Sequence, residues 1–367
     1  MDGRVLTLRD LNRATLARQR LLGRVDEPVG DVVGHLVGLQ AQAAISPFVG
    51  LWTRVEGVTR DDVARLLATR ELVKATLMRG TLHVARAVDY PVLRSTLQPV
   101  LTDGLAAVAK NRGGVPDVPA LVAAARGLLT GEPRSFKDIT ALFTELDPDG
   151  DAGIMRYAVR THLPMVQVPT SAQWCFPGNP TWSLADEWLG GPVDADPDAA
   201  GLVRRYLAAF GPGTAADVGT WSYLPGLEQV VEAIRDDLVV HRDEKGRELF
   251  DVEDAPLPGG EAEAPPRFLP EFDNVLLSHS DRRRLVADEH RKRVFLPGLR
   301  VAATVLVDGF VAGTWKVERQ GRKLATLTAS PFGALDRADR TALVEEAEHL
   351  VRFVAPDARD HAVEVAT

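Results

Sequence analysis

Three stretches of the chain share one order of elements, in which several helices are followed by two β-like runs. They span residues 7–95, 117–178 and 198–252. Apolar residues recur at helical spacing in the early part of each stretch, and β-like alternation follows in the last part. Helices followed by a hairpin are typical of a winged-helix module, so the pattern predicts three such modules in tandem. Sequence identity between the stretches is slight, so the repeat is structural.

The last third of the chain differs from these modules. Residues 254–266 are rich in proline, glycine and acids, which indicates a linker or surface loop. The runs that follow predict a sheet with turns at 308–309 and 319–322, closed by a helix over 337–354. We therefore expect an α+β protein whose three modules and β-rich C-terminal segment form a concave surface able to span a duplex. The expected divisions are residues 1–100, 101–190, 191–253 and 254–367.

Helix starts are marked at several points. Thr59, Ser135 and Thr214 each open a helical run, as N-cap residues do. Ser46 followed by Pro47 also looks like an N-cap with a first-turn proline. If a helix begins there, residues 40–45 contain a junction between two helices.

Composition limits the class of protein. The 367 residues exceed one comfortable hydrophobic core, which favours several subdomains. No apolar run is long enough to span a bilayer and no signal peptide begins the chain, so we expect a cytosolic protein without a membrane partner. The single cysteine, Cys175, lies between Trp174 and Phe176 and is interpreted as a packing residue. We expect a monomer, because three joined modules need no second subunit to build a groove.

Charge is distributed unevenly along the chain. The net charge of −8 argues against general affinity for nucleic acid. Residues 279–323, however, hold eleven Lys or Arg and only five Asp or Glu. A basic segment on an acidic body is either a docking face for a polyanion or a solvated surface with acids nearby. In the third module, acids at 228, 232, 236 and 237 would repel phosphates, which makes a plain transcription factor the weaker reading.

Several familiar chemistries lack their motifs. The eight histidines are scattered without a metalloprotease spacing, and paired cysteines are absent, so no metal is expected. Neither a Walker A sequence nor a dinucleotide-binding glycine motif occurs, so no cofactor is expected. The run Asp147–Asp151 looks like a calcium loop, but the position that needs a bidentate glutamate holds Ala158.

Two glutamines stand in an otherwise apolar stretch, HLVGLQAQAAISPFVGLWTRV. Side chains two residues apart on a helix point away from each other, so Gln40 and Gln42 can converge only if the chain leaves helical geometry there. Two amides at a junction either bind backbone groups or together hold a water or polar ligand. An amide is not a strong base near neutral pH, so such a pair suits a reaction that needs a positioned nucleophile.

The Gln–Ala–Gln motif, with RGTLHVA (79–85), FLPEFDNVLLSHSDR (268–282) and LVDGFVAGTWKV (306–317), resembles a bacterial winged-helix DNA glycosylase family over nearly the whole chain. The second glutamine is similar to the branch of actinobacterial enzymes that give self-resistance to azinomycin-type alkylating antibiotics; a related branch has Asp there. The resemblance implies hydrolysis of N7-alkylated purines in double-stranded DNA, and the unhooking of interstrand crosslinks in some members.

The resemblance also implies roles for individual residues. Gln40 and Gln42 would hold water at C1′ and stabilise developing positive charge by placement and fixed dipoles. No lysine nucleophile is expected, so the enzyme would be monofunctional. A β-hairpin would probe the groove, with its tip at Arg319, Gln320 and Arg322. DNA contacts are expected from Arg79, Thr81 and His83 of the first hairpin, and from Arg282, Arg283, Arg284, Arg291, Lys292 and Arg293.

Two other functions fit the same sequence. A non-catalytic winged-helix DNA-binding protein or regulator would bind DNA without releasing a base. A lesion-shielding protein would bind damaged DNA tightly and in a salt-dependent way, also without hydrolysis.

Overall fold

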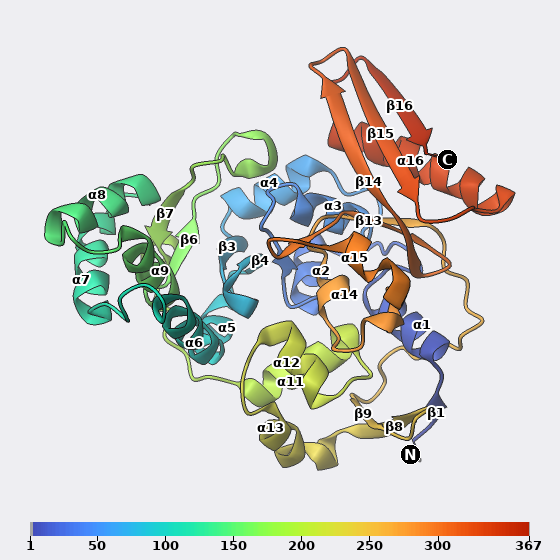
Figure 1. The fold of residues 1–367 in the computed structure, drawn as a ribbon, viewed down its shortest axis with the longest axis horizontal. Coiled ribbons are helices and arrows are strands. Elements are labelled where there is room, and N and C mark those ends of the chain that lie inside the picture. Colours follow the sequence, from blue (N-terminus) through green and yellow to red (C-terminus); the bar gives the residue numbers. More distant parts are fainter. Residues whose placement is uncertain (1–2, 367) are drawn as a thin grey trace.

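The computed structural model describes residues 3–366, which form the expected α+β fold (Figure 1). Helices α7 (Val118–Leu129), α8 (Phe136–Leu146) and α9 (Ala152–His162) lie at one end of the molecule, and a sheet covered by α16 (Arg337–Val354) lies at the other (Figure 1). Between them lie the hairpin of residues 72–86 and the helices α11 (Ala199–Phe210), α12 (Ala215–Ser222), α13 (Leu227–Ala233) and α14 (Asn274–Leu277).

The N-terminal part of the chain contains six α-helices after a short strand, with a hairpin among them. Its elements are β1 (Val5–Leu6), α1 (Leu8–Arg18), α2 (Val29–His35), β2 (Leu39–Gln40), α3 (Ser46–Trp52), α4 (Arg60–Ala68), β3 (Leu72–Thr76), the 3-10 turn η1 (Met78–Gly80), β4 (Leu82–Arg86), α5 (Tyr90–Thr96) and α6 (Gln98–Ala109). The boundary expected at residue 100 falls inside α6. Pro99 does not interrupt α6, because it lies in the first turn of the helix, where proline is tolerated.

In the next two parts, most helices again precede the strands. One contains α7 (Val118–Leu129), β5 (Arg134–Ser135), α8 (Phe136–Leu146), α9 (Ala152–His162), β6 (Met165–Gln167), η2 (Gln173–Cys175), β7 (Thr181–Leu184) and α10 (Ala185–Leu189). The other contains α11 (Ala199–Phe210), α12 (Ala215–Ser222), α13 (Leu227–Ala233), η3 (Arg235–Asp237), β8 (Val239–Asp243) and β9 (Glu248–Asp251).

The C-terminal part is richer in strands. It contains β10 (Arg267–Leu269), α14 (Asn274–Leu277), η4 (Arg282–Arg284), η5 (Asp288–His290), α15 (Arg291–Val294), β11 (Phe295–Leu296), β12 (Arg300–Val301), β13 (Thr304–Val307), β14 (Phe310–Gln320), β15 (Leu324–Pro331), α16 (Arg337–Val354) and β16 (Asp360–Val365). The turns expected at 308–309 and 319–322 join β13 to β14 and β14 to β15. Strand β16, which pairs in parallel with β15, was not expected.

The β3–β4 and β6–β7 hairpins share one sheet. Its order is β2-β4-β3-β6-β7-β5, because β3 pairs with β6 in antiparallel register, Lys74 opposite Gln167. The third hairpin, β8–β9, pairs instead with β1. Strands β10-β13-β14-β15-β16 form a separate sheet whose apolar side packs against α16. The loop at 254–266 is held against α1, since Arg9 and Arg13 donate to the carbonyls of Gly260 and Ala262.

Three of the four expected helix caps are confirmed. Thr59, Ser135 and Thr214 each form a capping box with an aspartate three residues later. The expectation for Ser46 is wrong: Ile45 is already in helical conformation, so Ser46 lies inside α3 and its buried hydroxyl has no partner. Within residues 3–366, no helix combines the length and the apolar character needed to cross a bilayer.

Candidate active site

The chain leaves helical geometry just before the two glutamines. Helix α2 ends at His35, and Val37 and Gly38 then adopt left-handed conformations with φ of 58° and 98°. A Cβ at Gly38 would lie 2.9 Å from the carbonyl oxygen of Val84, so this position requires glycine. The chain emerges as β2, in which Gln40 lies opposite His83 of β4. The expected break in helical geometry is confirmed, and it begins a few residues before Gln40.

Both glutamine side chains accept hydrogen bonds from the same segment. Gln40, which is buried, accepts at Oε1 from Nη2 of Arg79. Gln42, which is exposed, accepts at Oε1 from the backbone N–H of Leu82 at 3.2 Å. The two amides therefore converge on residues 79–82. An amide oxygen has two lone pairs, so each can still accept a hydrogen bond from a water.

Arg79 connects Gln40 to another helix. Its Nη1 donates to the carbonyl oxygen of Trp221 at the end of α12, while its Nη2 donates to Gln40. The Arg79 backbone is left-handed, with φ of 56°. Burial lowers the pKa of Arg79 to about 10, so the group stays charged at neutral pH. Both Nη groups are engaged within the protein, and the expected contact of Arg79 with DNA stays a prediction.

His83 is fully buried and neutral. Burial, followed by the charge of Arg79, lowers the pKa of His83 to about 3. Its Nδ1 lies 3.1 Å from the carbonyl oxygen of Thr81, and its Nε2 has no partner. The expected DNA contact by His83 is therefore wrong, because the side chain has no exposed surface. Thr81, half-buried, donates its hydroxyl to Met78.

Asn274 and Asp273, from the FDN part of the chain, bind different neighbours, and Asn274 holds the strand that contains Gln40. Asn274 Oδ1 accepts from the backbone N–H of Gln40 at 3.2 Å, and its Nδ2 donates to the carbonyl of Gly38 at 2.7 Å. Asp273 forms a two-pronged ion pair with Arg54, with N–O distances of 2.8 and 2.9 Å and no exposed side-chain surface on either residue. This segment belongs to one of the sequence motifs, but the motif predicted no role for these two residues.

The first basic cluster is used largely within the protein. Arg284 is buried and donates to the carbonyl of Pro212 at 2.8 Å and to Thr15, so its expected phosphate contact is wrong. Arg283 is paired with Asp281. Arg282 is half-buried, donates to Leu276 and lies over the ring of Phe295, 5.1 Å from its centroid.

The second basic cluster is more accessible. Arg291, Lys292 and Arg293 are exposed on α15. Arg291 lies 3.6 Å from Asp288, and the Arg293 guanidinium lies over Phe332 at 3.9 Å from the ring centroid. Charges at such positions remain available to a phosphate backbone.

A short hairpin follows this cluster. Strands β11 and β12 pair through Phe295 and Val301, and their turn presents Leu299, 94% exposed with φ of 58°. Because Arg282 lies over Phe295, the base of the hairpin packs against the segment of residues 274–282, which begins with Asn274. The sequence patterns did not predict this hairpin, although Pro297–Gly298 is a turn signal.

The tip expected to probe DNA lies elsewhere. Gln320 and Arg322 are exposed at the turn between β14 and β15, and Arg319 is paired with Asp357 at 2.6 Å. That turn projects at the far end of the C-terminal sheet, away from α12 and α14 (Figure 1). Its contact with DNA stays a prediction.

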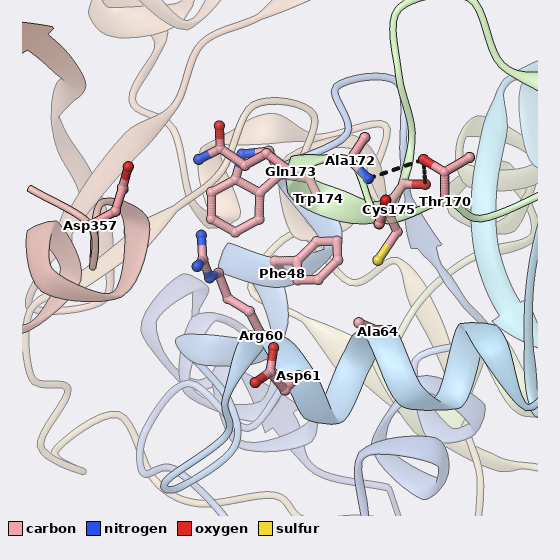
Figure 2. Close-up of a pocket in the computed structure, with 11 residues that line it drawn as sticks. Phe48, Arg60, Asp61, Ala64, Thr170, Ala172, Gln173, Trp174, Cys175 and Asp357 are labelled. Carbon is pink, nitrogen blue, oxygen red and sulfur yellow. Dashed lines mark hydrogen bonds between the residues drawn. The ribbon is translucent and has the colours of Figure 1, made fainter. Parts of the chain in front are cut away.

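A pocket of about 500 Å³ lies between α4, the β6–β7 loop and Asp357 (Figure 2). Trp174 and Cys175, both left-handed, form one wall, and Arg60 lies over the Trp174 ring at 5.2 Å. Cys175 is buried, and burial raises the pKa of its thiol, which fits a packing residue. Neither Gln40 nor Gln42 lines this pocket.

One buried lysine has a lowered pKa. Burial lowers the pKa of Lys74 to about 8, and its Nζ lies over Phe176 at 4.3 Å. The β3–β4 register pairs Lys74 with Val84, and pairs its neighbour Ala75 with His83. Because adjacent strand residues alternate between faces, Lys74 lies on the opposite face of the sheet from His83 and Gln40.

Two comparisons with known proteins bear on the fold and the family of this chain. The solved structure of DNA glycosylase AlkZ from Streptomyces sahachiroi matches with a TM-score of 0.81 at 23% sequence identity, covering all of both chains, so the two chains share one fold. A family model described as "DNA glycosylase AlkZ-like" matches residues 33–353. The chain therefore belongs to the AlkZ-like DNA glycosylase family.

A relative from the same organism, Streptomyces sahachiroi, extends this comparison. It is an interstrand DNA cross-link repair glycosylase, 28% identical over 370 residues that cover 92% of this chain and 94% of that protein. The resemblance inferred from the sequence motifs is confirmed, and so is the expectation of an enzyme that hydrolyses N-glycosyl bonds.

Proposed function

We propose that this enzyme hydrolyses the N-glycosidic bond of bulky N7-alkylguanine in double-stranded DNA, with Gln40 and Gln42 positioning the water, and that it unhooks interstrand crosslinks built on that lesion. The observation that carries the proposal is the convergence of the two amides on residues 79–82. The relative that repairs interstrand crosslinks supports the choice of lesion.

The chemistry needs placement more than proton transfer. Alkylation at N7 gives the base a positive charge, so the C1′–N9 bond breaks with its electron pair moving to the base, which leaves neutral. Water adds to C1′ of the resulting oxocarbenium-like sugar and loses its proton to solvent. Amide oxygens held by Arg79 and Leu82 can accept from that water and face the developing positive charge without reorganising.

Histidine and lysine chemistry have no part in the proposal. His83 is neutral and enclosed, and Lys74 lies on the other face of the sheet. A monofunctional hydrolase follows, since a lyase step would need an amine at C1′ to form a Schiff base.

We further propose that the three helix-and-hairpin units and the C-terminal part form a concave DNA-binding surface in a monomer. The exposed charges of α15 would contact phosphates, and the β11–β12 hairpin would enter the groove beside Gln40. The half-buried Arg282 supports this arrangement, because it lies over Phe295 of the hairpin and donates to Leu276 in the helix that begins at Asn274.

The test is release of the modified base from a duplex with one N7-alkylguanine, followed by alkali cleavage of the abasic site. Wild type is expected to release the base, whereas Gln40→Ala and Gln42→Ala should lose most of the rate. Gln229→Ala is the matched control, because Gln229 is an exposed amide on α13. Equal rates in all four proteins, with folding intact, would refute the role of the two glutamines.

A further inference from the structure

One exposed aromatic side chain lies next to the candidate active site. The chain contains six Trp, four Tyr and twelve Phe. Within residues 3–366, Tyr223 alone among them is exposed, at 62%. Every other aromatic residue in that range is buried or half-buried, so Tyr223 is an exception to how this chain uses its aromatic side chains.

The Arg79 guanidinium joins the end of α12 to Gln40. It donates one hydrogen bond to Gln40 and another to the carbonyl of Trp221, two residues before Tyr223. After burial itself, Tyr223 and Arg282 are the groups that most affect the pKa of Arg79. Tyr223 therefore lies close to the Arg79 guanidinium, which holds Gln40.

Tyr223 adopts a left-handed backbone conformation, which is unfavourable for a bulky residue. It caps α12 with φ of 67°, and its N–H donates to Gly219 at 2.8 Å. Its two neighbours, Ser222 and Leu224, are buried, and the Ser222 hydroxyl accepts from the Leu224 N–H at 3.0 Å. Glycine or asparagine fits a left-handed cap better than a bulky residue does. Backbone strain that holds an aromatic ring in solvent indicates a function for the ring.

We propose that Tyr223 stacks on the nucleobase next to the damaged nucleotide, while Gln40 and Gln42 face the C1′ carbon. This inference rests on the proposed function and names a binding contact for the same site. The ring is rigid and uncharged, and every base has a face on which it can stack. Departure of the lesion leaves a gap in the base stack, and a projecting ring can cover the base exposed there.

The test compares affinity for a duplex containing a tetrahydrofuran abasic analogue with affinity for the intact duplex of the same sequence. Tyr223→Asn removes the ring and keeps a residue that tolerates the left-handed cap. We expect it to lose about tenfold of the preference for the abasic duplex, within the range of base–aromatic stacking. Tyr223→Phe should retain the preference. Leu146→Ala, which removes a 59% exposed apolar side chain from the distant α8, should leave it unchanged.

Salt dependence separates stacking from charge. Because the ring carries no charge, the slope of log affinity against log salt should be the same in wild type and Tyr223→Asn. An unchanged preference in Tyr223→Asn, an equal loss in Tyr223→Phe, or a changed slope would each overturn the stacking role.

Failure of the proposed function has a separate readout. If wild type releases no N7-alkylguanine, the proposed reaction is wrong, yet the abasic preference still decides the role of Tyr223. If wild type shows no abasic preference, the stacking proposal is wrong, whatever the rate of base release.

Discussion

Arg79 and Gln40 are joined by a hydrogen bond that fixes the amide of the candidate active site. The same guanidinium holds the carbonyl of Trp221, so the rotamer of Gln40 depends on where α12 lies. A side chain locked by a charged donor is well suited to hold a water, because its dipole does not reorient during the reaction.

The first prediction concerns this bond. Arg79→Met removes the donors and keeps an apolar side chain of similar length. Losing a hydrogen bond from a charged group costs about 2 kcal/mol, so base release should slow by more than tenfold. Affinity for undamaged DNA and its salt slope should not change, since both Nη groups are used within the protein. Single-turnover rates and salt titrations measure both.

Lys292 supplies the contrast for that experiment. Lys292→Ala removes an exposed charge from α15 and should lower the salt slope by about one with little change in rate. If Arg79→Met instead behaved like Lys292→Ala, Arg79 would be a phosphate contact.

The second prediction concerns Asn274. Asn274→Ala leaves the N–H of Gln40 and the carbonyl of Gly38 without their partner. An unpaired buried polar group costs about 1–3 kcal/mol, so the free energy of unfolding in urea should fall by about that much for each group. Base release should fall as well, because β2 loses its support. A variant with wild-type stability and rate would show that Asn274 does not hold the strand.

Sequence patterns predicted what depends on neighbours along the chain. Thr59, Ser135 and Thr214 could be assigned as caps because a capping box needs only four residues. Ser46 was misassigned because a turn over residues 43–46 had already begun the helix.

In the candidate active site, too, only the features that depend on neighbours along the chain were predictable. The break beside Gln40 was predictable from local spacing, whereas the roles of Arg79 and Asn274 were not. Trp221 is 142 residues from Arg79 and Asn274 is 234 residues from Gln40, and no periodicity carries such a pairing. The burial of Arg284 was unpredictable for the same reason: a run of three arginines looks equally exposed at each position.

The third prediction concerns the buried ion pair of Arg54 and Asp273. Both side chains are fully enclosed, so removing one leaves a buried charge without its partner. Arg54→Met should lower the free energy of unfolding by about 3–5 kcal/mol. The double variant Arg54→Met, Asp273→Leu should recover part of that loss, since it leaves no unpaired charge. Urea unfolding of the single and double variants measures the coupling, and simple additivity would contradict it.

The fourth prediction concerns pH. The glutamines do not titrate, and the pKa of His83 is lowered to about 3, so the single-turnover rate should be flat between about pH 5 and 8. An inflection near pH 6.5 that disappears in His83→Leu would contradict a neutral imidazole.

The free energy of unfolding should depend on pH in a range where the single-turnover rate does not. Below about pH 6.5 the unfolded chain takes up a proton at His83 and the folded protein does not. The contribution of His83 to the free energy of unfolding is therefore fully present above that pH and is lost progressively toward pH 3. The slope should be about 1.4 kcal/mol per pH unit for such a group. His279, whose pKa burial also lowers to about 3, contributes in the same direction. Urea unfolding at pH 7.5, 6 and 5 measures the fall.

The last prediction separates the two hairpin tips. Leu299→Gly removes a 94% exposed side chain from the β11–β12 turn and relieves its left-handed backbone. Arg322→Ala removes an 83% exposed side chain from the β14–β15 turn. If the β11–β12 tip enters the groove beside Gln40, Leu299→Gly should slow base release with no loss of stability, while Arg322→Ala should lower only affinity and salt slope. The reverse pattern would return the groove-probing role to the β14–β15 turn, because a tip that acts on the lesion must change the rate and a phosphate contact need not.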